Sequence, residues 1–509
     1  MARHGPLWAA LLVTLAALGV YATTAAPGLT ITAAGADGAE LAVAVRTLGI
    51  AHPTGYPTYV LLAQAARLLP GGALAGRLSL FSALAAALTV GAVALAAAEL
   101  VSGEERPLPA VVAALTAGLT LAAAGLFWSQ AVIVEVYTLH TLFLALAVWL
   151  LLRWRRRGGP SLALAGLGLG LGLGNHVSLA LGAAGAAAFL AVARGRPRRP
   201  TWRELLAAGG ALLGGLLVYL YLPLRAAADP WLNWGNPRTL AAFWDHVTAA
   251  SYQHYLFQVP WQQALGRLSA VASLLLRDLF PHGVLLGAAG AIVLGRRDRA
   301  ALLLLGVPAG LGLLLALTYG GADSYVHLLP LYTGWALCAG VAAGKAAALL
   351  RGRWGPQAAR AALLLPLLAL PLFARGWGTW DQRRAPTSAA AWQRSLAAMP
   401  AGGILLTAAD EYTFPLWYLQ AVDGARPDVA LVDVRLLEWG WYREQLPARY
   451  PGLIVPEAGP AGWLRALLEA NAGRPALTMA GIPLPEGYSL QNAGPLFKVA
   501  APLPPIVPC

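Results

Sequence analysis

Runs of about 20 apolar residues recur along the first three quarters of the chain, each long enough to cross a hydrocarbon core of about 30 Å as a helix. The 509 residues are 58% hydrophobic and only 12% charged, with a mean hydropathy of +0.62. Soluble proteins of this length are far less apolar. The sequence therefore predicts a mainly helical, polytopic membrane protein rather than a bundle of buried soluble helices.

About eleven transmembrane helices are expected from these runs. In chain order they cover residues 7–26, 78–101, 109–127, 131–152, 161–174, 177–193, 204–224, 271–294, 300–319, 328–350 and 358–374. The fifth and sixth runs are short and rich in glycine, so we expect them to be tilted, broken or re-entrant. The first run has no convincing cleavage site before Pro27 and is interpreted as a retained helix.

The net charge of +13 is carried mostly by arginines in short loops between the runs, which indicates topology rather than nucleic-acid binding. With the expected helices, all clusters of arginine and lysine fall on one side of the membrane. By the positive-inside rule that side is the cytoplasm. The clustered residues are Arg3, Arg153, Arg155, Arg156, Arg157, Arg194, Arg196, Arg198, Arg199, Arg203, Arg296, Arg297, Arg299, Lys345, Arg351, Arg353 and Arg360. We therefore expect a plasma-membrane protein with a cytoplasmic N-terminus. Two cysteines, Cys338 and Cys509, are too few for a disulfide framework.

This topology divides the chain into a transmembrane part, residues 1–375, and an extracytoplasmic domain, residues 376–509. Two further outside segments cover 28–77 and 225–270. In the last domain, residues 403–410 and 428–434 are expected to be buried strands and 414–424 a helix, which together make a βαβ unit of a small α/β domain. Neither strand is followed by a GxGxxG or GKS/T loop, so nucleotide binding is not indicated.

Polar chemistry is concentrated in the first outside loop. Asp37 and Glu40 are three residues apart, so on a helix they share a face and present two carboxylates, and a carboxylate can serve as a general base. The same spacing fits a capping box at the start of an amphipathic interfacial helix, and the two interpretations are compatible. His52 lies in a Pro- and Gly-rich turn that can hold an imidazole rigidly, although a histidine in a turn is often structural.

Five blocks of sequence, in colinear order, resemble one known family. They are Asp37-x-x-Glu40-Leu41 with TLGIAHPTGYPTY (47–59), WSQAVIVEVYTLH (128–140), Gly174-Asn175-His176, YLPLRAAADPWLNWGNP (221–237) with the FWDHVTAASYQHYLF that follows, and FPLWYLQAVDGARPDVALVDVRLL (414–437). The chain is similar to multi-pass proteins carrying domain of unknown function 2723, which resemble the vertebrate transmembrane protein O-mannosyltransferase. Thr54 stands where the family usually has a second proline.

The resemblance implies a GT-C fold and a glycosyltransferase that uses a sugar, such as mannose, linked to a polyprenyl phosphate. The acceptor is then a hydroxyl of a protein, lipid or glycan on the extracytoplasmic face, and the transfer is expected to be inverting. In such enzymes the base is an acidic residue just after the first helix, the place that Asp37 occupies. Glu40 is the second catalytic candidate.

A departing lipid phosphate needs a cation at the outer surface, for which we expect Arg225, with His52 and Tyr56 as further donor-binding candidates. An interfacial arginine can equally well only snorkel. The further candidates for lining the site are Asn175, His176, Glu135 and Trp234, with His140, Trp231 and Asp323 as weaker ones. Each has a structural alternative: a helix cap for Asn175 and His176, a buried partner for Glu135 and His140, the aromatic belt for the tryptophans and a solvated turn for Asp323.

No cofactor or metal site is predicted, because histidines and acidic residues do not cluster at metal-ligand spacings. Two other functions remain open. A transporter or flippase of lipid-linked sugar would show internal repeats and ionisable groups near the bilayer midplane. A non-catalytic membrane assembly protein would use the outer domain to bind a partner. The clustering of polar candidates outside the helices favours the transferase.

Overall fold

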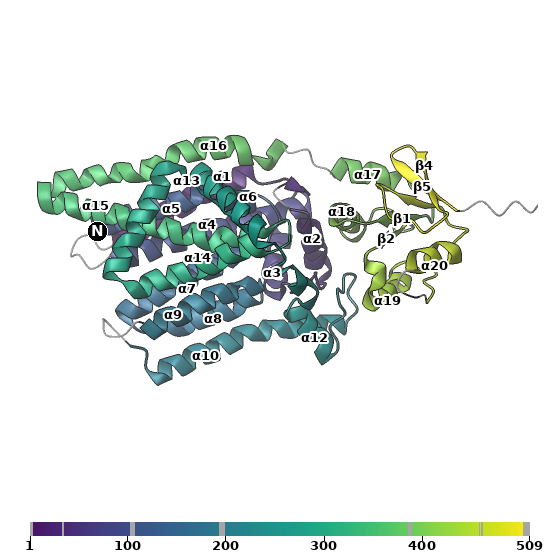
Figure 1. The fold of residues 1–509 in the computed structure, drawn as a ribbon, viewed down its shortest axis with the longest axis horizontal. Coiled ribbons are helices and arrows are strands. Elements are labelled where there is room, and N and C mark those ends of the chain that lie inside the picture. The colour runs from purple at the N-terminus through teal and green to yellow at the C-terminus, as the bar shows by residue number, and fades with distance from the viewer. Residues whose placement is uncertain are drawn as a thin grey trace, which may run out of the picture.

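The fold is that of a computed structural model, which describes residues 4–32, 35–101, 107–192, 199–384, 389–457, 459 and 462–501. Long helices lie side by side, and a small sheet domain sits beyond one end of them (Figure 1). Arg3, Arg194, Arg196, Arg198 and Cys509 lie outside the described residues.

The described residues of the helical part form sixteen numbered α-helices with short 3-10 segments between them. They are α1 Gly5–Thr24, α2 Asp37–Thr47, α3 Pro57–Leu62, α4 Leu74–Val101, α5 Leu108–Ala123, α6 Gly125–Ala131, α7 Tyr137–Arg157, α8 Ser161–Leu173, α9 Ala180–Val192, α10 Trp202–Leu216, α11 Tyr221–Ala226, α12 Leu240–Val247, α13 Trp261–Arg297, α14 Arg299–Thr318, α15 Leu329–Ala361 and α16 Leu370–Trp380. The 3-10 segments η6 Ala250–Tyr255 and η7 Ser324–Leu328 matter for the site below.

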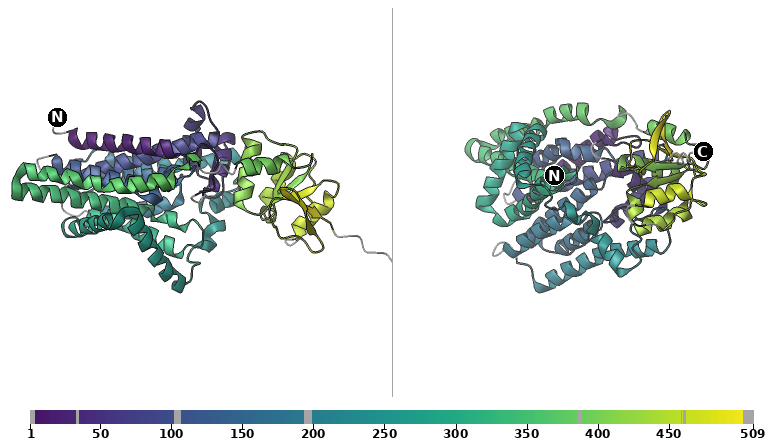
Figure 2. Two further views of the ribbon diagram at one scale, coloured as in Figure 1. Left: turned by 90° about the horizontal axis from the view of Figure 1, so that it is seen from above. Right: turned by 45° about the vertical axis from the view of Figure 1, so that its right-hand side comes forward.

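Within the described residues, seven helical runs are long and apolar enough to span a membrane, or eight if the bent pair α5 and α6 counts as one span. The expected eleven are therefore not confirmed, although each expected range overlaps a helix. The number of spans differs because some helices are short or interrupted. Helices α8 and α9 are short, and the run Ser324–Trp380 reverses direction at Gly355, where φ is +81°. Figure 2 shows the two halves of this run, in green, as neighbouring arms joined at one end.

Glycines let the helices approach closely, as expected for helix pairs in a membrane. In α8, a Cβ on Gly166 or Gly170 would lie 2.2 Å from a backbone carbonyl oxygen of α10. A Cβ on Gly340 of α15 would lie 2.6 Å from the carbonyl oxygen of Ala113 in α5. The Gly-rich stretch 166–174 is therefore a packing surface between helices.

The outer domain is built on a five-stranded sheet of order β2-β1-β3-β5-β4. Its strands are β1 Ile404–Thr407, β2 Ala430–Asp433, β3 Ala476–Thr478, β4 Ser489–Ala493 and β5 Leu496–Ala500, and its helices are α17 Ala389–Ala397, α18 Asp410–Ala421, α19 Gly440–Arg449 and α20 Trp463–Ala470. β1 and β2 are parallel and α18 connects them, which is the expected βαβ unit. The helix begins at Asp410, four residues earlier than expected.

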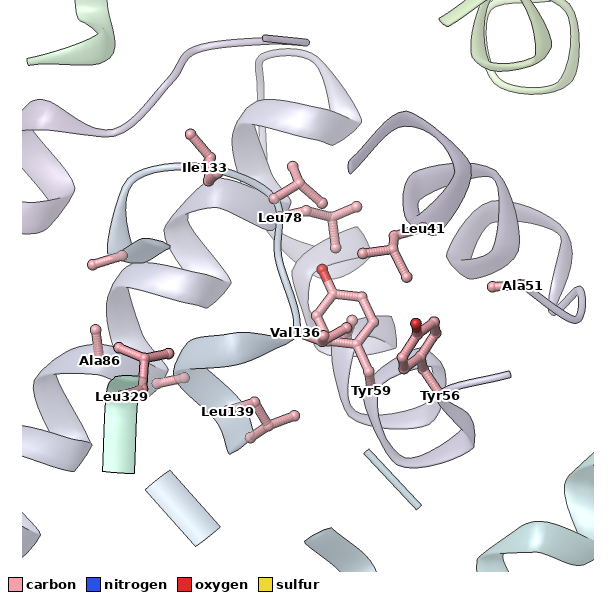
Figure 3. Close-up of a cluster of buried hydrophobic side chains, with 14 of the residues drawn as sticks. Leu41, Ala51, Tyr56, Tyr59, Leu78, Ala86, Ile133, Val136, Leu139 and Leu329 are labelled. Carbon is pink, nitrogen blue, oxygen red and sulfur yellow. The ribbon is translucent and has the colours of Figure 1, made fainter. Parts of the chain in front are cut away.

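Helix α2 lies between the helical part and the outer domain, where α18 packs against it (Figure 1). Residues 38–45 of α2 are all buried, so the expectation of an amphipathic interfacial helix is wrong. The expected capping box is also wrong: Ala36 is the N-cap, Asp37 is the first helical residue, and no side chain caps the helix. Figure 3 shows part of the core here, with Leu41 of α2 near Tyr59 and Leu78.

Candidate functional site

A cavity of about 620 Å³ lies where the helical part meets the outer domain. Its walls come from the first outside loop, the 174–178 break, the 234–256 segment, the end of α14 with the turn after it, and the start of α18. Its polar and aromatic lining residues are Asp37, His52, Thr54, Tyr56, Tyr137, His176, Ser178, Trp234, Thr248, Tyr252, Gln253, Tyr255, Tyr319, Asp323, His327, Asp410, Glu411 and Phe414.

The turn that carries His52 is held from two sides. Ile50 forms an isolated parallel bridge with Asn233, which brings Trp234 beside the His52 ring at 6.1 Å between centroids. The Gly55 amide donates to the His52 carbonyl at 2.8 Å, and Gly55 has φ of +79°. A Cβ there would lie 2.7 Å from Leu222 and 2.9 Å from His246, so the turn needs glycine for both conformation and space.

Both carboxylates of α2 reach His52. Glu40 is fully buried; its Oε1 accepts the His52 backbone amide at 2.9 Å, and its Oε2 pairs with the Nδ1 of the ring. Asp37 Oδ2 lies 3.8 Å from the His52 Nε2, and 35% of the Asp37 side chain stays accessible at the cavity wall. Glu40 therefore holds the imidazole, while Asp37 faces the space where a substrate would lie.

The two ionisable groups at the wall have shifted pKa values. Burial would lower the pKa of His52, but the charges of Glu40 and Asp37 outweigh it and raise that pKa to about 10. The imidazole is therefore protonated at neutral pH, and its Nε2 donates to the Tyr56 hydroxyl at 2.7 Å. Desolvation raises the pKa of Asp37 to about 7, against the opposing effect of His52 and with help from Glu40, Asp410 and Asp323. A carboxyl with such a pKa can accept a proton near neutral pH.

Seven aromatic side chains form a closed belt around the cavity. Successive ring centroids are 5.0 to 6.4 Å apart in the order His52, Tyr56, His176, His327, Tyr319, Tyr255 and Tyr252, and Tyr252 returns to His52 at 6.1 Å. Tyr137 packs on His176 at 5.5 Å, and its hydroxyl donates to Asp323 at 2.9 Å. Such a belt offers flat apolar faces together with hydroxyl and imidazole groups, a combination suited to an uncharged polar ligand such as a sugar.

Five residues singled out from the sequence line this cavity: Asp37, His52, Tyr56, His176 and Trp234, and the weaker candidate Asp323 does too. Glu40 and Asn175 are fully buried beside it, and the side-chain Nδ2 of Asn175 donates to the Val136 carbonyl at 3.1 Å. Glu135 is buried and accepts the Val136 amide at 3.2 Å. These three adjoin the site without facing it.

Arg225 is engaged elsewhere. Its Nε donates to the Leu48 carbonyl at 2.7 Å and an Nη to the Thr47 carbonyl at 3.4 Å, at the C-terminal end of α2. A cation suits that position, because the last carbonyls of a helix lack partners. Arg225 is not among the residues that line the cavity, so its role in binding donor phosphate stays a prediction.

Several lining residues were not found from the sequence. Tyr252 and Tyr255 come from η6, Tyr319 and His327 flank the turn after α14, and all four are brought together only by packing. Asp410 and Glu411 did carry a signal, because they follow β1 and the carboxyl ends of parallel strands commonly carry ligand sites. Among the described residues, no group of three or more His, Cys, Asp and Glu side chains is placed to hold a metal ion.

Comparison with known families matches both parts of the chain. Residues 37–200 match the model of the protein O-mannosyl-transferase TMEM260 N-terminal domain, and residues 388–451 match TMEM260-associated domain 2. The mouse protein O-mannosyl-transferase TMEM260 is 26% identical over 455 residues, which are 83% of this chain and 62% of the mouse protein. The chain thus spans less than two thirds of that relative. These matches confirm the family resemblance seen in the sequence.

Solved structures show the same fold. ArnT from Cupriavidus metallidurans bound to undecaprenyl phosphate aligns over 98% of both chains with a TM-score of 0.57 and 14% identity. Its apo form aligns over 92% of both chains with a TM-score of 0.60 and 15% identity. The oligosaccharyltransferase AglB from Archaeoglobus fulgidus, in complex with an inhibitory peptide and a dolichol-phosphate, aligns over 94% of this chain and 69% of its own, with a TM-score of 0.53 and 12% identity. The fold is therefore that of the GT-C glycosyltransferases, which are multi-pass membrane proteins.

Proposed function

We propose that the chain is a membrane glycosyltransferase, because residues 37–200 and 388–451 match models of TMEM260 domains and the fold is that of the GT-C enzymes. It moves a sugar, mannose by analogy with the name of the mouse relative, from a polyprenyl-phosphate donor to a hydroxyl of a polypeptide on the extracytoplasmic face. The observation that carries this proposal is Asp37: an accessible carboxyl at the wall of an aromatic cavity, beside an imidazolium that a buried glutamate holds in place.

In the proposed reaction Asp37 is the general base. A hydroxyl is a weak nucleophile until its proton is removed as the new bond forms. The acceptor O–H proton passes to Asp37, the acceptor oxygen bonds to the anomeric carbon, and the bond from that carbon to the phosphate oxygen breaks. The phosphate leaves with the electron pair. Attack opposite the leaving group inverts the anomeric configuration.

The departing phosphate needs positive charge or hydrogen-bond donors. Among the described lining residues no lysine or arginine is present, and the protonated His52 is the cation at the wall. We assign to His52 and Tyr56 the donor contacts, with the other hydroxyl and imidazole groups of the belt as further hydrogen-bonding partners. No divalent metal is assigned to this reaction, so turnover is expected to persist after chelation with EDTA.

We place the N-terminus in the cytoplasm and the outer domain, with the cavity, on the extracytoplasmic side of the plasma membrane. The arginine clusters support this orientation. Reporter fusions at Arg157 and Pro451 test it. An extracytoplasmic Arg157 or a cytoplasmic Pro451 would refute the assignment.

The direct test of function is Asp37→Asn in the full chain, purified in nanodiscs and supplied with polyprenyl-phosphate mannose and Ser/Thr peptides. Asparagine keeps the shape of the side chain but cannot take the proton, so turnover should fall by roughly two to four orders of magnitude at an unchanged thermal midpoint. The matched control is Asp423→Asn, at an exposed aspartate of the outer domain that does not line the cavity. Wild-type turnover in Asp37→Asn would remove Asp37 as the base.

A further inference from the structure

The outer domain supplies part of the cavity wall. The start of α18 contributes Asp410, Glu411 and Phe414, and α18 packs on α2, the helix that carries Asp37. Phe414 is 3% exposed and packs on Trp234, another lining residue, at 6.3 Å between centroids. The Asp410 carboxylate is near enough to Asp37 to raise the pKa of Asp37. A substrate that reaches Asp37 therefore lies against residues of the outer domain.

The outer domain is held firmly in that position by α19. Gln445 donates to the Asn233 carbonyl at 2.6 Å, and Arg449 donates to the Trp231 carbonyl at 2.5 Å. The Arg449 guanidinium also lies 4.0 Å from the centroid of the Trp231 ring. These contacts attach the domain to the same loop that carries Trp234. The first residues of α18 are therefore a fixed part of the cavity wall.

This wall makes the cavity acidic. The lining carboxylates are Asp37, Asp323, Asp410 and Glu411, while His52 is the one lining side chain held positive among the described residues. Asp410 shares Arg435 with Asp433, whereas Glu411 is exposed and forms no ion pair within the described part of the chain. Phe414 packs on Trp234 beside them, so the lining next to the carboxylates is partly apolar. Negative potential next to an apolar surface attracts cationic peptide segments and repels acidic ones.

We propose that the first turn of α18 selects the acceptor by charge: Glu411 and Asp410 favour a polypeptide with lysine or arginine flanking the reactive hydroxyl and disfavour one flanked by aspartate or glutamate. This inference rests on the proposed function and extends it to the acceptor. Glu411 and Asp410 are specificity-determining residues, and Phe414 packs on Trp234 beside them.

The size of the effect follows from Coulomb's law. Two unit charges about 8 Å apart, at an effective dielectric constant between that of a protein surface and that of water, change affinity by roughly five- to tenfold. Exposed charges are screened over about 10 Å at 0.1 M salt, so the preference should shrink as salt is raised. A specificity that depends on salt would distinguish charge recognition from recognition of shape.

The experiment uses the full chain in nanodiscs of zwitterionic lipid and two synthetic threonine peptides that differ only in flanking lysines or glutamates. Peptide affinity, measured by fluorescence anisotropy at low salt, should favour the lysine peptide over the glutamate peptide by roughly 25- to 100-fold, because the flanking charge raises the affinity of one and lowers that of the other by five- to tenfold each. Glu411→Gln should reduce that ratio and Glu411→Lys should reduce it further or reverse it. Glu438→Gln and Glu438→Lys, at an exposed glutamate of the same domain that does not line the cavity, should leave it unchanged.

Equal affinities for the two peptides in the wild type, or no binding of either, would overturn the inference. An equal response to Glu411→Lys and Glu438→Lys would overturn it as well, because the preference would then reflect the overall charge of the domain. Sugar transfer to the bound peptides is measured separately. A charge preference in binding without any transfer would refute the proposed function but not the acidic peptide site.

Discussion

The raised pKa of Asp37 predicts how transfer depends on pH. A carboxyl with its ordinary pKa near 4 is fully ionised throughout the physiological range, whereas burial brings that of Asp37 to about 7. Below that value the carboxyl is protonated and cannot act as a base, so the rate should fall as pH falls. The ionised fraction is about 10% at pH 6 and about 90% at pH 8, so the chemical step should speed up roughly ninefold between them.

Single-turnover transfer, measured from pH 5.5 to 8.5 at constant ionic strength, isolates the chemical step from product release. His52 should contribute no inflection in this window, because its pKa is raised to about 10. The residual rate of Asp37→Asn provides the control and should not show the inflection. A wild-type rate that is constant from pH 5.5 to 8.5 would refute the assignment, since it would indicate a base with an ordinary carboxyl pKa.

Two substitutions test the surroundings of the site, and a third tests a buried contact between helices. Glu40→Gln removes the charge that holds His52 protonated, so the pKa of His52 should fall. Turnover should then decrease as pH rises from about 7 to 9, because His52 loses its positive charge in that range. A pH profile identical to that of the wild type would contradict this. Arg225→Ala should weaken donor binding, as expected for a cation that binds the donor phosphate, whereas an unchanged donor affinity with unfolding stability lowered by about 1–2 kcal/mol would show that Arg225 acts only through its bonds to Thr47 and Leu48. Asp278→Asn should lower the free energy of unfolding by about 2–4 kcal/mol, because buried Asp278 accepts hydrogen bonds from the Leu126 backbone amide, the Tyr332 hydroxyl and Arg277. The measurement is thermal unfolding, with Asp245→Asn as the control. Equal midpoints in the two variants would show that these contacts contribute little.

Features that depend on local sequence were predictable. Hydropathy located a helix in every expected range, and alternation of apolar runs with turn residues located β1, α18 and β2. The number of spans was not predictable in the same way, because the bend between α5 and α6 and the reversal at Gly355 depend on packing between distant helices. Tyr252, Tyr319 and Asp410 come from three separate segments, and no local pattern indicates that they share a cavity.

Glu40 shows why the first outside loop was only half predictable. A spacing of three residues suits a capping box, and it equally places two carboxylates one turn apart on the same face of a helix. The choice depends on where the helix begins. Because α2 begins at Asp37, neither carboxylate caps it, and both are available to a partner twelve or more residues away.

That partner is His52, and its fixed turn makes the two carboxylates different. The His52 amide and Nδ1 occupy both oxygens of Glu40, which is fully buried, while the Nε2 stands 3.8 Å from Asp37, which keeps 35% of its side chain accessible. One acidic residue is thereby committed to orienting an imidazolium, and the other is left open to the cavity with a pKa near neutrality. The division of roles between Asp37 and Glu40 therefore arises from tertiary structure, since residue type and spacing alone are compatible with either residue as the base and the other as the partner of His52.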